Sequence, residues 1–201
     1  VDATSKQIER SIQKDKNLFK LLEKFKGRKG YLYDHSYMCA YVCEVLCKDM
    51  NWTSQETKMK LSYASILHDV SLTENMNADK VQDANTQNSE SREKLEEYHA
   101  HPMFVAEIVR NSKGLPPNID TIISQHHENP EGNGFPRGLN AHVISQLSCV
   151  FIVAHTFVCE MYTIEFDETL YNDTLIAMNE RFSIGNYRLP MQALWNNFYK
   201  E

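Results

Sequence analysis

Apolar residues recur at helical spacing along almost the whole chain, and this periodicity constrains the fold more than any other feature. Segments of this kind cover residues 6–26, 37–50, 53–69, 91–112, 116–128, 143–162, 175–182 and 191–199. The alternating pattern typical of strands is almost absent. Only 7 glycines and 6 prolines occur in 201 residues, too few turn formers for a many-stranded sandwich. We therefore predict an all-α fold, a bundle of helices.

Several helix ends can be placed from local signals. Thr53, with Glu56 three residues later, predicts the start of a helix through a capping box. Pro102 predicts a break beside His101, because proline disturbs a helix interior. Pro116 and Pro117 predict the first turn of the next helix. The polar, aperiodic stretch 72–90 predicts a long exposed loop.

Charge and composition exclude several classes of protein. The formal net charge is −6, so the chain lacks the basic surface that a nucleic-acid duplex or an anionic membrane requires. No apolar run approaches the length of a membrane-spanning helix, and the first twenty residues are too polar for a signal peptide. The five cysteines stand in apolar helical stretches, which favours buried thiols over disulfides or a thiolate metal site. We expect a cytoplasmic protein.

The chain opens with Val1 rather than Met, so we expect that it was trimmed from a longer protein with an N-terminal partner domain. Residues 1–30 then form an N-terminal helix that could serve as a linker, and residues 31–201 form the main domain.

Histidines are concentrated at the ends and on the faces of the predicted helices. Three of them stand in two adjacent pairs of candidate ligands, His68-Asp69 and His126-His127. Neighbours on a helix point about 100° apart, so both members of a pair reach one pocket only from a helix end or by turning toward two ions. Imidazole nitrogen and carboxylate oxygen suit iron, manganese, cobalt or zinc better than magnesium. The candidate ligands are His35, His68, Asp69, His101, His126, His127 and His155, whereas His99 and His142 are interpreted as ordinary core or surface histidines.

These residues, with the glycine-rich stretch that follows them, resemble a known family. His68-Asp69 closes an apolar helix, His101-Pro102 follows, and residues 126–136 read HHENPEGNGFP. This is similar to the HD-GYP branch of the HD-domain metal phosphohydrolases, whose signature runs HD-x-G-K, HP and HHE-x-x-DG-x-GYP-x-GL. The chain keeps six of the eight specified positions from HHE to GYP, with Glu131 for aspartate and Phe135 for tyrosine.

The resemblance spans about residues 31–165 and implies an HD-domain helical bundle with a dinuclear metal centre. It implies that His35 is the first ligand, that Asp69 bridges two divalent ions, and that His155 replaces the last aspartate ligand. Iron is the metal expected first and manganese is an alternative. Two ions rather than three are expected because Tyr31 stands where a third site would need glutamate.

The resemblance also implies roles around the metals. Asp69 is the catalytic carboxylate, and Glu128 either orients a ligand ring or closes the glycine loop. The substrate, a cyclic dinucleotide such as cyclic-di-GMP, would contact Gly132, Gly134, Phe135, Pro136 and Arg137. This loop or the missing N-terminal domain would contact signalling partners, in the cytoplasm of a bacterium.

Other positions depart from the family pattern, and three functions remain open. Leu72 replaces the lysine of HD-x-G-K, and Phe135 lacks the phenol hydroxyl of tyrosine. The first function is a metal-dependent phosphodiesterase that cleaves cyclic-di-GMP or a related cyclic dinucleotide. The second is a catalytically degenerate domain that keeps the metals and binds the nucleotide as a sensor or interaction domain. The third is a di-iron oxygenase of HD-like fold.

Overall fold

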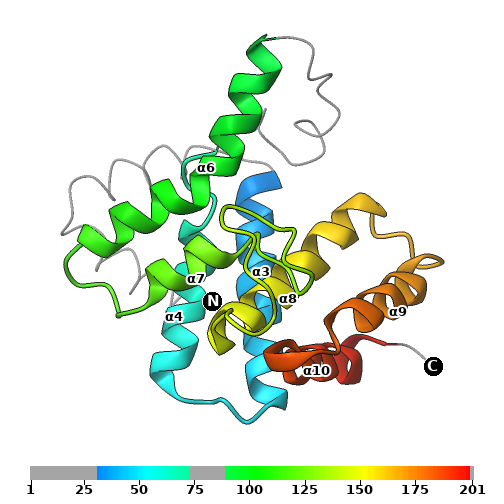
Figure 1. The fold of residues 1–201 in the computed structure, drawn as a ribbon. Coiled ribbons are helices and arrows are strands. Elements are labelled where there is room, and N and C mark those ends of the chain that lie inside the picture. The colour runs from blue at the N-terminus through cyan, green and yellow to red at the C-terminus, as the bar shows by residue number, and fades with distance from the viewer. Residues whose placement is uncertain (1–30, 73–88, 200–201) are drawn as a thin grey trace.

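The structure, a computed structural model, describes residues 31–72 and 89–199. In these two ranges every regular element is a helix, and the only β-type pairing is an isolated bridge between Glu131 and Asn140. The predicted all-α class is therefore confirmed (Figure 1). The helix expected over residues 6–26 and most of the loop expected over 72–90 lie outside the described residues.

The described helices follow one another along the chain. Their bounds are α3 Tyr31–Asp49, α4 Gln55–Leu67, α6 Ser89–Asn111, α7 Ile119–Gln125, α8 Gln146–Thr163, α9 Tyr171–Phe182, the 3₁₀ turn η2 Gly185–Tyr187 and α10 Arg188–Phe198. The glycine-rich loop separates α7 from α8.

Helix α8 lies at the centre of the bundle, in contact with α3, α4, α7, α9 and α10. Its sequence is apolar on most sides, and its buried residues run from Ser148 to Met161. The side chain of Ser145 caps it by accepting a hydrogen bond from the backbone N–H of Ser148, at 3.1 Å. The predicted central buried helix is confirmed, although it begins three residues later than the apolar pattern indicated.

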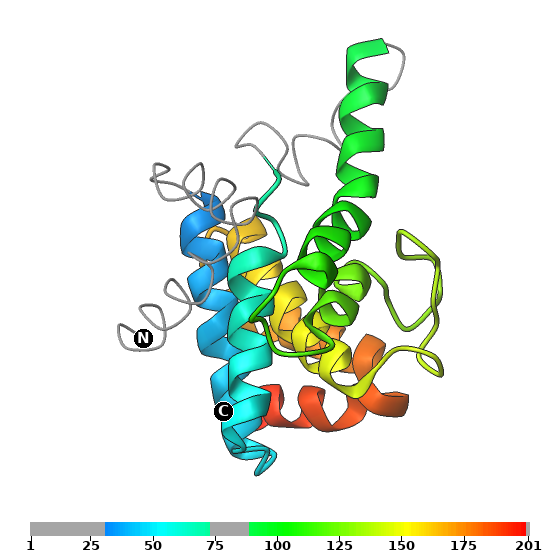
Figure 2. The same ribbon diagram turned by 90° about the vertical axis from the view of Figure 1, so that its left-hand side faces the viewer.

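Helices α6 and α7 pack against each other, and the first half of α6 extends beyond the rest of the bundle in both views (Figures 1 and 2). Among the described residues, no helix combines the length and the apolar character needed to cross a membrane.

Three of the predicted helix signals were wrong in detail. The cap of α4 is Ser54 and not Thr53, since the Ser54 side chain accepts a hydrogen bond from Thr57 N at 3.1 Å. Pro116 and Pro117 precede α7 instead of forming its first turn, because Asn118 takes a left-handed conformation before the helix begins. Pro102 does not break α6, which runs continuously through it for a reason that lies in the site.

Candidate metal centre

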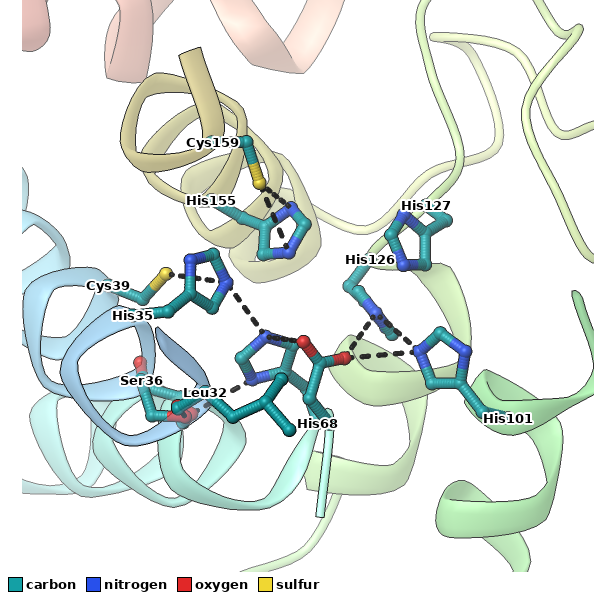
Figure 3. Close-up of polar contacts among 12 residues, drawn as sticks. Leu32, His35, Ser36, Cys39, His68, His101, His126, His127, His155 and Cys159 are labelled. Atoms are coloured by element: carbon teal, nitrogen blue, oxygen red, sulfur yellow. Dashed lines mark hydrogen bonds and ion pairs between the residues drawn. The ribbon is translucent and has the colours of Figure 1, made fainter. Parts of the chain in front are cut away.

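The two adjacent pairs, His68-Asp69 and His126-His127, reach one region because each pair stands at the C-terminal end of a helix. His68 caps α4 and His126 caps α7, so that Asp69 and His127 lie in the turns that follow. Longer helices carry the remaining histidines: His35 on α3, His101 on α6 and His155 on α8 (Figure 3). The predicted convergence of pairs from helix ends is thus observed in the geometry.

The seven candidate ligands form two groups that share one carboxylate. His35, His68, Asp69 and His155 make up the first donor group, and Asp69, His101, His126 and His127 make up the second donor group. Within each group the potential ligand atoms lie within 4.8 Å of one another. Each group therefore offers three imidazole nitrogens and one carboxylate oxygen, a donor set that can hold a transition-metal ion.

The two oxygens of Asp69 divide between the groups. Oδ2 lies 3.2 Å from Nε2 of His68, whereas Oδ1 lies 3.2 Å from Nε2 of His101 and 3.5 Å from Nε2 of His126. Oδ1 is buried and accepts no hydrogen bond from the described residues, despite its two close nitrogens. A buried carboxylate oxygen without a hydrogen-bond donor is costly unless a cation completes its surroundings.

Backbone carbonyls fix the orientation of three of the rings. Nδ1 of His68 lies 2.9 Å from Ser65 O, Nδ1 of His126 lies 2.6 Å from Ile123 O, and Nδ1 of His101 contacts Tyr98 O. A carbonyl only accepts, so each Nδ1 must carry its hydrogen and each Nε2 of the neutral ring must carry a lone pair.

Two of these lone pairs face each other across a short distance, since Nε2 of His101 lies 3.1 Å from Nε2 of His126. Nε2 of His68 also lies 3.3 Å from Nε2 of His35. Facing lone pairs repel unless a proton or a metal ion lies between them. The orphaned Asp69 oxygen and the opposed imidazoles therefore fit bound cations.

Pro102 explains why a backbone carbonyl is available to the ring of His101. In an uninterrupted helix the N–H of residue 102 would donate to Tyr98 O, but proline has no N–H. The Tyr98 carbonyl is then available to His101 Nδ1. The proline thus leaves α6 continuous and supplies the acceptor that orients a candidate ligand.

Burial keeps several of the imidazoles neutral. It lowers the pKa of His35 to about 3 and that of His126 to about 4, and it holds the pKa values of His127 and His155 well below their usual range, with neighbouring imidazoles adding to the effect. Burial alone would raise the pKa of Asp69, but a proton on Nε2 of His68, His101 or His126 supplies a positive charge and a hydrogen bond that outweigh burial and hold that pKa well below its ordinary value. A charged carboxylate among neutral imidazoles is the protonation state that binds metal.

The glycine-rich loop covers the second donor group. The ring of Phe135 stacks on that of His127 with centroids 4.3 Å apart. The backbone N–H of Phe135 donates a hydrogen bond to His127 O at 3.1 Å. Gly134 permits this approach, because a Cβ there would lie 2.4 Å from His127 O. Both oxygens of buried Glu128 accept backbone hydrogens of the loop, from Arg137 N at 2.9 Å and from Leu139 N at 2.6 Å. Of the two predicted roles for Glu128, these contacts favour closing the loop.

The other residues that the sequence singled out take varied positions. Gly132 has a positive φ, Pro136 follows Phe135 in the loop, and Arg137 is exposed at the surface. His99 and His142 belong to neither donor group, although the ring of His99 lies 4.6 Å from Phe135.

Three residues close to the donor groups were missed by the sequence reasoning. Cys39 Sγ lies 3.6 Å from Nε2 of His35, Cys159 Sγ lies 3.9 Å from both ring nitrogens of His155, and Tyr98 Oη lies 3.4 Å from Nε2 of His127. Each stands three or four residues from a candidate ligand on the same helix face, a spacing that could have indicated them.

The cysteines behave as packing residues. All five are free thiols, and four of them are buried. Burial raises the pKa of Cys39 well above its ordinary value, that of Cys47 to about 11 and that of Cys149 to about 12. Thiols with raised pKa values stay protonated. The prediction of free cysteines holds for all five, and that of burial for all but Cys159, which is half-buried.

Comparison with models of protein families matches residues 12–169 to the HD domain. Neither curated proteins nor solved structures give a match. HD domains bind divalent metals, and the family suggests a metal-dependent phosphohydrolase; the two donor groups could hold such metals. Because the match covers most of the chain, this protein belongs to the HD domain family.

Proposed function

We propose that this chain is a metal-dependent phosphodiesterase of the HD-GYP kind, and that it cleaves cyclic-di-GMP or a related cyclic dinucleotide in the bacterial cytoplasm. The observation that carries the proposal is the single carboxylate shared by two groups of three histidines. The motif HHENPEGNGFP supports the finer assignment to the HD-GYP branch.

In this proposal the seven ligands would hold two divalent ions. Iron is the metal expected first, and manganese is the alternative. Bound ions of this kind lower the pKa of water and neutralise charge on phosphoryl oxygens. Asp69 would hold both ions together, one oxygen toward each group, as its contacts with His68 and His101 suggest. The carbonyls of Ser65, Tyr98 and Ile123 keep three rings in the tautomer that donates Nε2.

The loop would bind the substrate beside the second donor group. Phe135 covers one face of His127 and excludes water from it. Glu128 holds the loop in place through two backbone hydrogen bonds, which leaves the Arg137 side chain exposed for contact with phosphate. Glu128 therefore acts by positioning, without touching the reacting atoms.

A second candidate is a sensor that binds the nucleotide without cleaving it. One observation favours it: Leu72, at the position of the family lysine, is only 2% exposed and belongs to the hydrophobic core. A cation that would stabilise charge on the phosphate is therefore missing at this position.

The two candidates are separated by turnover. Protein purified without oxygen and loaded with iron or manganese should convert cyclic-di-GMP to a linear product, as measured by chromatography, whereas the Asp69→Asn variant should not. Binding without product would favour the sensor. Product that forms only with oxygen would indicate an oxygenase. Wild-type protein that binds no metal after loading would contradict the proposal as a whole.

A further inference from the structure

His99 presents an exposed imidazole beside the glycine-rich loop. It stands on α6 between Tyr98 and Ala100, and it is exposed whereas Tyr98 and His101 are buried. The ring centroid of His99 lies 4.6 Å from that of Phe135, with the two ring planes 40° apart. His99 belongs to neither donor group. Its imidazole therefore contacts the loop without being a candidate ligand.

Three rings form a series from the second donor group to the surface. His127 belongs to that group, and its ring centroid lies 4.3 Å from that of Phe135 in a stacked arrangement. Phe135 in turn contacts His99. His127 and Phe135 are half-buried, and His99 is exposed. A molecule bound at the second donor group would therefore have flat rings beside it in the direction of solvent.

These rings are suited to a nucleobase. In a nucleotide one sugar joins the phosphate to a flat aromatic base, so a phosphate bound at the donor group brings a base close to it. Histidine and phenylalanine are both side chains on which bases stack. Phe135 already stacks on His127, whereas the ring of His99 is open to a base that arrives from solvent.

We propose that His99 stacks on a nucleobase of a substrate whose phosphate is bound at the second donor group. The inference rests on the proposed function and adds to it a residue that recognises the base. His99 contacts the base and not the reacting phosphate, so it determines which phosphate compounds bind tightly. The class that it selects is nucleotides over sugar phosphates without a base.

The test uses two compounds that differ only by the base, guanosine monophosphate and ribose phosphate, each with its phosphate on the primary hydroxyl of the sugar. Wild type and three variants are loaded with metal, their metal content is measured by elemental analysis, and each compound is titrated by calorimetry. His99→Ala removes the ring, and His99→Phe keeps an aromatic ring at this position. His142→Ala is the matched control, because it removes an exposed imidazole that also belongs to neither donor group.

We expect all four proteins to hold the same metal and to bind ribose phosphate equally. Wild type should bind guanosine monophosphate about 5- to 100-fold more tightly than ribose phosphate, which is the contribution expected from stacking of one base. His99→Ala should lose most of this difference, whereas His99→Phe and His142→Ala should keep it.

Equal affinities of wild type for the two compounds would overturn the inference, and so would an unchanged difference in His99→Ala. A His99→Phe variant as weak as His99→Ala would also overturn it, because an aromatic ring would then not be what the base requires. Loss of metal from His99→Ala would overturn it by making His99 a support of the metal centre. Failure of the proposed function is distinguished because it shows as absent cleavage of cyclic-di-GMP by wild type, whereas stacking is measured by the binding of a monoester.

Discussion

The carboxylate of Asp69 has one oxygen on the side of His68 and the other on the side of His101 and His126. No other described residue belongs to both donor groups. Its loss should therefore affect both groups, whereas loss of one histidine removes a ligand from one group only. Substitutions at single residues can test this arrangement.

Asp69→Asn should abolish binding of both metal ions while leaving the side chain's shape unchanged. An amide carries no charge, and it offers a single oxygen where the carboxylate offers two. We expect the affinity to fall by more than the roughly 10–100-fold that loss of a partner outside the ligand set causes. Elemental analysis after dialysis measures the effect. His99→Ala, beside Phe135 but outside both groups, is the control, and a lower metal content in that variant than in Asp69→Asn would contradict the assignment.

The metal-free protein should lose stability as the pH falls below about 6.5, the ordinary pKa of histidine. Burial lowers the pKa of His35 to about 3 and that of His126 to about 4 in the folded protein. Between these values and 6.5 the unfolded chain binds more protons than the folded one, so acid favours unfolding. Each such imidazole contributes a slope of about 1.4 kcal/mol per pH unit.

Urea unfolding of the metal-free protein at pH 7, 6 and 5 measures this slope. A free energy of unfolding that stayed constant from pH 7 to pH 5 would mean that the buried rings carry protons in the folded state.

At the scale of helices and loops, the sequence predicted which segments are helical but not how their ends are made. Periodicity reports which face is buried, and this placed α8 and the histidine pairs correctly. The choice of Ser54 over Thr53 as cap depends on a single hydrogen bond that either hydroxyl could make. Pro102 was interpreted as a helix breaker because the sequence does not show that His101 Nδ1 contacts the Tyr98 carbonyl, which proline leaves without its usual helix partner.

Pro102→Ala should weaken metal binding without reducing the helical content. The new N–H at residue 102 would compete with His101 Nδ1 for the Tyr98 carbonyl and loosen the ring. We expect metal affinity to fall about tenfold, as for other partners that orient a ligand. Circular dichroism and a metal titration measure the two quantities. Met103→Ala, at the exposed next position, should bind metal normally, and equal affinities for both variants would argue against this role of the proline.

Gly134→Ala should displace the loop from the second donor group. The added Cβ would overlap His127 O and Glu128 Cα, at 2.4 and 2.7 Å, and backbone atoms cannot move aside cheaply. A cost of about 1–3 kcal/mol in the free energy of unfolding is expected from such overpacking. In Gly114→Ala the added Cβ would have no atom within 4 Å, so this variant tests the effect of a positive φ alone. Chemical denaturation should show a larger loss in the free energy of unfolding for Gly134→Ala than for Gly114→Ala. The opposite order would mean that the loop does not pack against His127.

At the scale of the whole molecule, the two donor groups connect helices that are far apart in the sequence. The candidate ligands come from α3, α6 and α8 and from the C-terminal ends of α4 and α7. The sequence could indicate these candidates only through motif spacing, because the packing that brings α3 and α8 together depends on the entire core. The same convergence means that bound ions would link five helices into one cooperative unit.

Removal of metal should therefore lower the melting temperature of the whole domain. An ion present at 100 times its dissociation constant stabilises the folded state by about 2.7 kcal/mol, which corresponds to roughly 5–10 °C per site for a chain of this size. Calorimetry with and without a chelator measures the shift. Asp69→Asn serves as the control, because a protein that holds no metal should melt at one temperature in both buffers. A wild-type protein that also showed no shift would be a helical bundle whose stability owes nothing to ions, and its opposed imidazoles would then have to share protons.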